Sequence, residues 1–201
     1  MTKGGKRGPF DPVPDAERIS DHDVRAAAYG TVFAGAFGYT YGGNGVFQMT
    51  KTNVQASWRW DPRQTWDHAL QLPGASQMQH LRALSGSFPM LSRVPAPDLI
   101  EPDEGKAART AYDRLAATRG AAGDYALVYT ASGRNIRVRM DRLAPPTMDA
   151  FWFNPRTGRW RADTAETDQP RPFARGITAG SGAPTREFVP PDRNDWVLVL
   201  K

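Results

Sequence analysis

The chain has 201 residues, of which 40% are hydrophobic and 23% charged, and its formal net charge is +5. This length and composition allow one domain of ordinary size or two small ones, and they exclude a chain that is disordered or fibrous throughout. The sequence has no cysteine, which excludes disulfide frameworks, thiolate zinc sites, iron–sulfur clusters and cysteine nucleophiles.

Residues 1–19 are rich in Gly, Pro and charged side chains and predict a flexible lead-in. The first helix is predicted from Ser20, because Ser20 and Asp23 form a capping box, and it runs to Phe33 before Gly35 and Gly38. Residues 39–41 favour a short strand that stops at the glycine-rich loop 42–45. A second helix is predicted over residues 74–85, and the aromatic-rich stretch 50–72 between them predicts a long loop.

Pro-rich and acidic residues at 89–105 predict a domain boundary, with a linker over 91–105. The second half predicts an antiparallel β-sandwich of seven short strands, at 114–119, 125–130, 135–140, 147–154, 159–163, 185–189 and 196–200. Asn154, Pro155 and Gly158 predict a hairpin turn between two of these strands, whereas residues 165–182 predict an exposed loop.

The basic residues predict no nucleic-acid partner. The positive charge is divided almost evenly between the two halves, and Arg137 and Arg139 alternate with Ile136 and Val138, as in a half-buried strand. No apolar run has the length of a membrane span, so no membrane partner is expected.

Candidate catalytic groups are few. Of the three histidines, His22 lies inside the capping box, and His68 and His80 are twelve residues apart with no carboxylate at ligand spacing to join them, so neither a metal nor a cofactor is expected. A nucleophile elbow and a phosphate-binding loop are also missing from the sequence. Hydrolysis of a glycosidic bond needs two carboxyl groups, and only Asp67, beside Trp66, is a candidate in the first half. We therefore assign no catalytic residue.

An aromatic and amide group in the first half has the composition of a sugar-binding site, because aromatic faces stack on sugar rings and amides bind hydroxyl groups. The alternative interpretation is that these aromatic residues form the core of a barrel or loop. The candidate substrate-binding residues are Tyr39, Tyr41, Asn44, Gln48, Trp66 and Asp67, near the further aromatic residues Phe47, Trp58 and Trp60.

The order of motifs resembles a known pair of domains. Residues 21–48, including Phe33-Ala-Gly-Ala-Phe-Gly-Tyr-Thr-Tyr-Gly42, and residues 72–82 resemble the last part of the apiosidase-like glycoside hydrolase barrel. Residues 124–129, 151–158, 188–191 and 195–200 resemble the C-terminal domain that usually follows this barrel and is named a putative collagen-binding domain.

This resemblance implies an α+β chain: a flexible lead-in (1–19), the last βα units of a (β/α)8 barrel (20–90), a linker (91–105) and a β-sandwich (106–201). It also implies a retaining glycosidase that acts on plant-type polysaccharide. Tyr39 and Phe47 stand where family members usually have His and Trp. The catalytic carboxylates of the family lie upstream of the matching residues, so this chain is expected to be catalytically incomplete.

The implied partners are a carbohydrate, bound by a complete barrel, and the missing N-terminal barrel half, encoded in the same or a neighbouring gene. The family is usually secreted or periplasmic, but the chain as written has no signal peptide and would stay in the cytoplasm. Two alternatives remain open: a non-catalytic module that binds carbohydrate or protein through Trp152, Trp160 or Trp196, and a truncated reading frame without function. Tryptophans within strand patterns favour the core.

Overall fold

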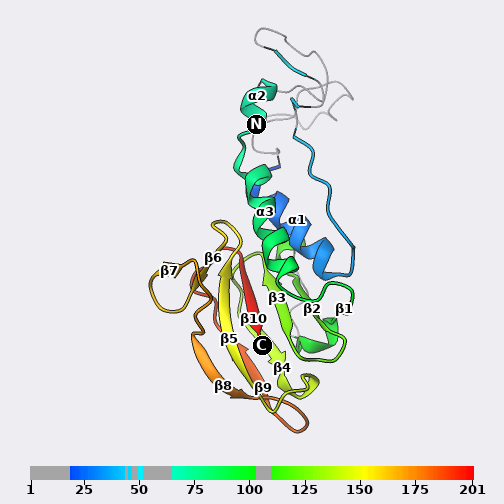
Figure 1. Ribbon diagram of the computed structural model, residues 1–201, viewed down its shortest axis with the longest axis vertical. Helices are drawn as coiled ribbons and strands as arrows, with labels where there is room; N and C mark the ends of the chain where they lie inside the picture. Colours follow the sequence, from blue (N-terminus) through cyan, green and yellow to red (C-terminus); the bar gives the residue numbers. More distant parts are fainter. Residues whose placement is uncertain (1–18, 44, 47–48, 52–64, 103–109) are drawn as a thin grey trace, which may run out of the picture. The chain divides into compact units, whose positions relative to one another are not determined.

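The computed structural model describes residues 19–43, 45–46, 49–51, 65–102 and 110–201 (Figure 1). The expected lead-in therefore lies almost entirely outside the described residues. Contacts divide the chain into two compact units, the first made of residues 1–24 and 40–76 and the second of residues 25–39 and 77–201. None of the helices in the described ranges has the length and apolar character needed to cross a membrane.

The first helix, α1, spans Asp21–Phe33 and begins as the capping box predicts. The Ser20 Oγ accepts a hydrogen bond from the Asp23 amide at 3.2 Å, and the Asp23 carboxylate accepts one from the Ser20 amide at 2.6 Å. Gly35, with φ of 104°, leads the chain away from the helix. The strand expected at 39–41 is wrong, because these residues pair with no other segment that the structure describes.

Two further helices follow. The short helix α2, Trp66–Ala69, lies inside the stretch expected to be a loop, and its Trp66 amide donates to the Thr50 carbonyl at 2.9 Å. The helix α3, Pro73–Gly86, confirms the second predicted helix. In the first unit, Gly74 lies against Asp21 and Val24, where an added Cβ would be 3.4 Å from Val24 Cγ2.

The second unit is built on an eight-stranded antiparallel sheet in the order β1-β2-β3-β10-β5-β6-β7, with β8 also paired to β5. A two-stranded sheet pairs β4 with β9. The strands are β1 (Arg93–Pro95), β2 (Leu115–Gly120), β3 (Ala126–Thr130), β4 (Ile136–Arg139), β5 (Thr147–Asn154), β6 (Arg159–Arg161), β7 (Glu166–Thr167), β8 (Ala174–Thr178), β9 (Thr185–Phe188) and β10 (Trp196–Leu200), with 3-10 turns at Pro97–Leu99, Ala111–Asp113 and Met140–Arg142.

Both faces of the large sheet are covered by apolar side chains. On one face, Val128, Trp152 and Leu198 belong to a cluster with Ile136 and Val138 of the small sheet. On the other face, a second cluster joins the sheet to the second-unit parts of α1 and α3 (Figure 1). Its main members are Ala28, Tyr29, Val32, Phe33, Leu81, Leu84, Leu127, Tyr129, Phe151, Phe153, Val197 and Val199.

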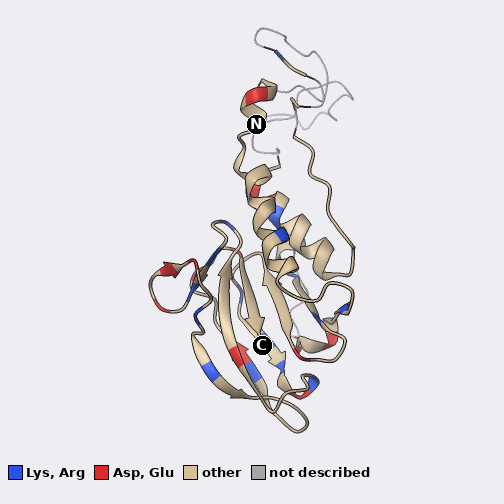
Figure 2. Cartoon of the chain, viewed as in Figure 1, with Lys and Arg blue, Asp and Glu red and all other residues tan. Residues whose placement is uncertain are grey.

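The α+β class is confirmed, and so are all seven predicted strands. The hairpin is confirmed too, because β5 pairs with β6 and Gly158 has φ of 71°. The tryptophans Trp152 and Trp196 are buried in the core, as expected. The alternation in β4 is also confirmed, since Ile136 and Val138 are buried, and basic and acidic residues are interspersed over the strands (Figure 2).

Three strands lie where none is predicted. The strand β1 lies within the stretch 91–105 expected to be a linker, and it pairs with β2. The strands β7 and β8 lie within the expected loop 165–182 and pair with β6 and β5. All three are short and lie beside longer strands, so pairing with a neighbour and not their own composition makes them strands.

Candidate functional site

The structure brings only some of the candidate sugar-binding residues together. In the first unit, Gly43 lies close to both Tyr41 and α2, since an added Cβ would be 3.9 Å from Tyr41 Cε1 and 3.8 Å from the Ala69 carbonyl oxygen. The helix α2 also carries Trp66, whose side chain is partly exposed. Tyr39 belongs to the second unit, whereas Asn44, Phe47, Gln48, Trp58 and Trp60 lie outside the described residues.

Asp67 has the electrostatics of a helix start. The Thr65 side chain donates a hydrogen bond that lowers the pKa of the Asp67 carboxyl below its usual value, and the backbone amides of Asp67 and His68 add to this effect. A general acid needs the opposite, a carboxyl group whose pKa is raised so that it keeps its proton. Asp67 is therefore suited to stabilising the start of α2 and not to donating a proton.

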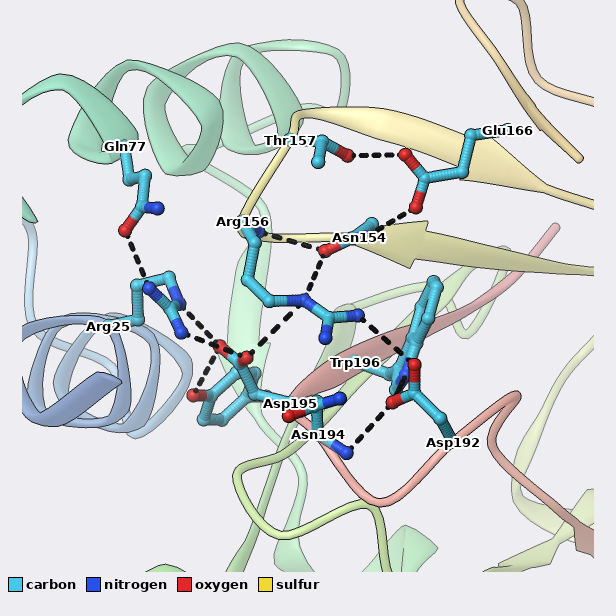
Figure 3. A network of polar contacts seen from close by, with 11 residues as sticks. Arg25, Gln77, Asn154, Arg156, Thr157, Glu166, Asp192, Asn194, Asp195 and Trp196 are labelled. Atoms are coloured by element: carbon cyan, nitrogen blue, oxygen red, sulfur yellow. Dashed lines mark hydrogen bonds and ion pairs between the residues drawn. The ribbon is translucent and has the colours of Figure 1, made fainter. Parts of the chain in front are cut away.

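The most developed polar network lies in the second unit and centres on Asp195, which has no exposed surface (Figure 3). The Arg25 guanidinium donates to both of its carboxylate oxygens, through Nε at 2.7 Å and Nη2 at 3.2 Å. The Tyr129 hydroxyl donates to the same carboxylate at 3.2 Å. Arg25 also reaches α3, because its Nη1 donates to Gln77 Oε1 at 2.6 Å.

A bidentate pair of this kind is strong only when both charges are fully bonded, because moving each charge out of water costs several kcal/mol. Here the Asp195 carboxylate is balanced by Arg25 and, at 3.8 Å, by the Arg156 Nε. The pair thus fixes the second turn of α1 to the residue that precedes β10.

Arg156 extends the network to the β5–β6 hairpin. Its backbone amide and Nε both donate to Asn154 Oδ1, at 3.0 and 2.8 Å. The Asn154 side-chain amide in turn donates to Glu166, and the Thr157 hydroxyl donates to the other oxygen of that carboxylate at 2.8 Å (Figure 3). These bonds hold the turn that the Asn-Pro sequence predicts.

The outer end of the network is Asp192. Burial raises the pKa of this carboxyl, but hydrogen bonds from the Trp196 indole and the Asn194 amide, both at 2.8 Å, and the nearby Arg156 guanidinium lower it to below its usual value. The Arg156 guanidinium carbon also lies 4.9 Å from the centre of the Trp196 ring, within the range of a cation–π contact.

This arrangement positions elements and offers no reacting group. The charged groups at the centre of the network bind other charged groups or the residues of a turn. Among the described residues, no group of three or more His, Cys, Asp or Glu side chains could hold a metal ion.

The sequence analysis missed the network because Arg25 and Asp195 are 170 residues apart. One local signal was available: Arg25 stands among the apolar residues Val24 and Ala26 to Ala28 of the first helix, and a charge that is buried there needs a partner. Asp195 gives no comparable signal, since an aspartate before a strand is ordinary turn composition.

Comparison with known proteins divides the chain in two. Residues 8–92 match a family model described as "Apiosidase-like, catalytic domain". Residues 94–201 match one described as "Putative collagen-binding domain of a collagenase". The curated proteins that were compared include no match.

Two solved structures are similar to the chain. One is named "Glycoside hydrolase", with 31% identity and a TM-score of 0.73, and the match covers 90% of this chain and 36% of that one. The other is a glycoside hydrolase family 5 from Bacteroides vulgatus, with 32% identity and a TM-score of 0.74, covering 94% of this chain and 37% of that one. The chain thus spans little more than a third of the length of each.

Proposed function

Because the chain belongs to the family described as "Putative collagen-binding domain of a collagenase", preceded by an apiosidase-like catalytic segment, we propose that it is the C-terminal portion of a glycoside hydrolase. In this proposal residues 94–201 form a platform that holds the second-unit parts of α1 and α3, the last helices of the catalytic segment, in place. The complete enzyme is a retaining glycosidase that acts on plant-type polysaccharide.

The main support for this proposal is the buried ion pair between Arg25 and Asp195. Arg25 lies in the residues that match the catalytic domain, and Asp195 lies in those that match the C-terminal domain. A binding module on a flexible linker would not need a buried charge pair with its neighbour, whereas a platform that fixes a catalytic segment would. The apolar cluster shared by α1, α3 and the large sheet supports the same function.

The helices also fit the barrel part of the proposal. Arg25 near the start of α1 bonds Gln77 near the start of α3, and Phe33 and Leu84 near their ends share one apolar cluster, so the two helices run in the same direction. Parallel neighbouring helices are typical of βα units. We therefore assign α1 and α3 to the outer helices of a partial barrel, and the two packed sheets to a β-sandwich.

The chain's share of the solved hydrolases, 36–37% of their length, supports the proposal that other residues supply the catalytic carboxylates. The test compares hydrolysis of aryl glycosides and plant polysaccharides by two proteins. One is the purified 201-residue chain, and the other is the Bacteroides vulgatus glycoside hydrolase with its matching part replaced by this chain. We expect hydrolysis only by the second. Hydrolysis by the 201-residue chain would contradict catalytic incompleteness, and inactivity of a folded second protein would contradict the glycosidase assignment.

A binding role for the platform is a second candidate, favoured by the description of its family and by Trp160, which lies in β6 and is only partly buried. Affinity electrophoresis in gels that contain polysaccharide or collagen tests it. Retardation of the chain that is lost in Trp160→Ala would support it, and equal mobility in all gels would exclude it.

A further inference from the structure

The turn of the β5–β6 hairpin contacts two helices of the segment that matches the catalytic domain. Arg156 acts on α1 through Asp195, since its Nε lies 3.8 Å from the carboxylate that binds Arg25. Gly158 packs against α3, because the three atoms nearest to a Cβ added there all belong to the His80 ring. Two residues that are two positions apart in one turn therefore reach two helices that are far apart in the sequence.

The two helices are also bonded to each other, so the contacts form a closed ring. The Arg25 Nη1 donates to Gln77 Oε1 at 2.6 Å, which joins α1 to α3 (Figure 3). Gln77 and His80 are three positions apart in α3 and so lie on one face of that helix. The ring runs from the turn through Asp195 to α1, across to α3, and back to the turn at Gly158. All its members belong to the second unit.

The turn can hold the helices because its own side chains are fixed. Asn154 Oδ1 accepts hydrogen bonds from both the backbone amide and the Nε of Arg156, at 3.0 and 2.8 Å. The Arg156 guanidinium carbon lies 4.9 Å from the centre of the Trp196 ring, and only 23% of the Arg156 side chain is exposed. Because the planar guanidinium is held at these points, its charge keeps one place relative to the turn.

Arg156 faces two carboxylates, and burial determines which of them depends on it more. Its Nη2 lies 3.7 Å from Asp192, and its Nε lies 3.8 Å from Asp195. Both distances exceed the length of a hydrogen bond, so Arg156 acts on these groups as a charge. The Asp192 side chain is 38% exposed and screened by water, whereas the Asp195 side chain has no exposed surface. The charge of Arg156 therefore acts more strongly on Asp195, beside Arg25.

We propose that the turn 154–158 is a positioning element for the catalytic segment, and that Arg156 and His80 are its positioning residues. In this inference, which rests on the proposed function, the closed ring sets the spacing of α1 and α3. Loosening the ring at one contact should loosen the others, because the same three elements close it. The inference goes beyond the platform, since it assigns the positions of both helices to one turn and not to the sheet as a whole.

Hydrogen exchange of the Arg25 Nε–H group, measured by NMR in the 201-residue chain, tests the proposal. This group donates to Asp195 at 2.7 Å and belongs to α1, so it reports on the ring at a point outside the turn. The variant Arg25→Lys identifies its signal, which disappears in that protein. The test variants are Arg156→Met and Gly158→Ala, which alter the ring at its two contacts with the turn.

Each test variant has a matched control. Arg159→Met removes an arginine of the same hairpin, whose exposed ion pair with Asp168 lies outside the ring. Gly182→Ala places a methyl group at a position with φ of 81° and no described heavy atom within 4 Å. Alanine at Gly158 has a similar φ of 71°, but its methyl group meets the His80 ring. The second pair therefore separates backbone strain from displacement of α3.

We expect the Arg25 Nε–H to exchange about tenfold faster in Arg156→Met and in Gly158→Ala than in the wild-type chain, and at the wild-type rate in both controls. The backbone amide of Leu198, in the central strand β10, reports global unfolding, and its exchange should change less. Equal or slower Arg25 exchange in the test variants, or equal acceleration of Arg25 and Leu198, would overturn the proposal.

The hybrid of the Bacteroides vulgatus hydrolase and this chain separates the inference from the proposed function. If the hybrid hydrolyses glycosides, Arg156→Met should lower its kcat/KM by about threefold or more relative to Arg159→Met, because displaced helices displace the groups that they carry. Equal activity of these two variants would overturn the positioning role. A folded hybrid without hydrolysis would contradict the proposed function, and the Arg25 exchange in the 201-residue chain then decides whether the turn positions the helices.

Discussion

At the scale of single residues, the stacked side chains of Tyr29 and Tyr129 differ in the hydrogen bonding of their hydroxyl groups. The rings of Tyr29 and Tyr129 lie 4.9 Å apart at 15°, and both are almost fully buried. The Tyr129 hydroxyl donates to Asp195, whereas the Tyr29 hydroxyl has no hydrogen-bond partner in the part of the chain that the structure describes. Burial raises the pKa of both hydroxyls far above the usual value, so both stay protonated. An unpaired buried hydroxyl costs about 1–3 kcal/mol.

We therefore predict opposite effects of the same substitution. Tyr29→Phe should raise the free energy of unfolding by about 1 kcal/mol, because it removes an unpaired polar group. Tyr129→Phe should lower it by about 1.5–3 kcal/mol, because it removes a hydrogen bond to a charged acceptor. Urea unfolding followed by fluorescence measures both. A loss of stability in Tyr29→Phe would show that its hydroxyl has a partner.

The pair Arg25–Asp195 supports a prediction about buried charge. Arg25→Met should lower the free energy of unfolding by about 3–5 kcal/mol, because it leaves a buried carboxylate without its main partner. The double variant Arg25→Met/Asp195→Leu should lose less than the single one, because it removes both charges together. Thermal and urea unfolding of the three proteins test this order. A double variant that is less stable than Arg25→Met would mean that the carboxylate is stabilised mainly by its other partners.

At the scale of elements, α3 packs closely on the turn of the β5–β6 hairpin through His80. A methyl group added at Gly158 would overlap the His80 imidazole, so the turn packs directly on that ring. Burial lowers the pKa of His80 below its usual value of 6.5. A histidine whose pKa is lower in the folded protein than in the unfolded chain binds a proton more readily when the chain is unfolded. Protonation at low pH therefore lowers the free energy of unfolding.

We predict that the contact between α3 and this hairpin weakens in acid. Stability due to neutral His80 should be fully present above pH 6.5 and should decline as the pH falls below that value, towards and through the lowered pKa of the folded state. The measurement is the thermal midpoint between pH 7.5 and 5, compared with His80→Gln, which cannot titrate. Parallel profiles for the two proteins would show that His80 does not contribute.

Whether the sequence predicts an element depends on how close in the chain its bonded residues are. The capping box at Ser20 and the hairpin at Gly158 are predictable because their bonds join residues within a few positions. The strands β1, β7 and β8 are not, because partners elsewhere in the chain make them strands. The polar network depends on a contact across 170 residues, and a local pattern can single out Arg25 but cannot identify Asp195 as its partner.

At the scale of the whole molecule, the family boundary near residue 93 and the compact units do not coincide. The second unit takes residues 25–39 and 77–92 from the segment that matches the catalytic domain. These residues supply Tyr29, Phe33, Leu81 and Leu84 to the cluster on one face of the large sheet. A family domain expressed without them would expose that face to water.

We therefore predict that residues 94–201 do not form a stable domain alone. Without α1 and α3, the sheet would expose Leu127, Tyr129, Phe151 and Val199, and Asp195 would lose Arg25. Exposed apolar surface of this size leads to association, and a buried carboxylate without its partner favours unfolding. In the fragment, near-ultraviolet circular dichroism should show the loss of fixed side-chain packing, and size-exclusion chromatography should show aggregation. The full chain should appear folded by both measurements. A monomeric fragment with a cooperative thermal transition would show instead that the sheet's other face and the small sheet suffice, and the platform would then be an independent domain.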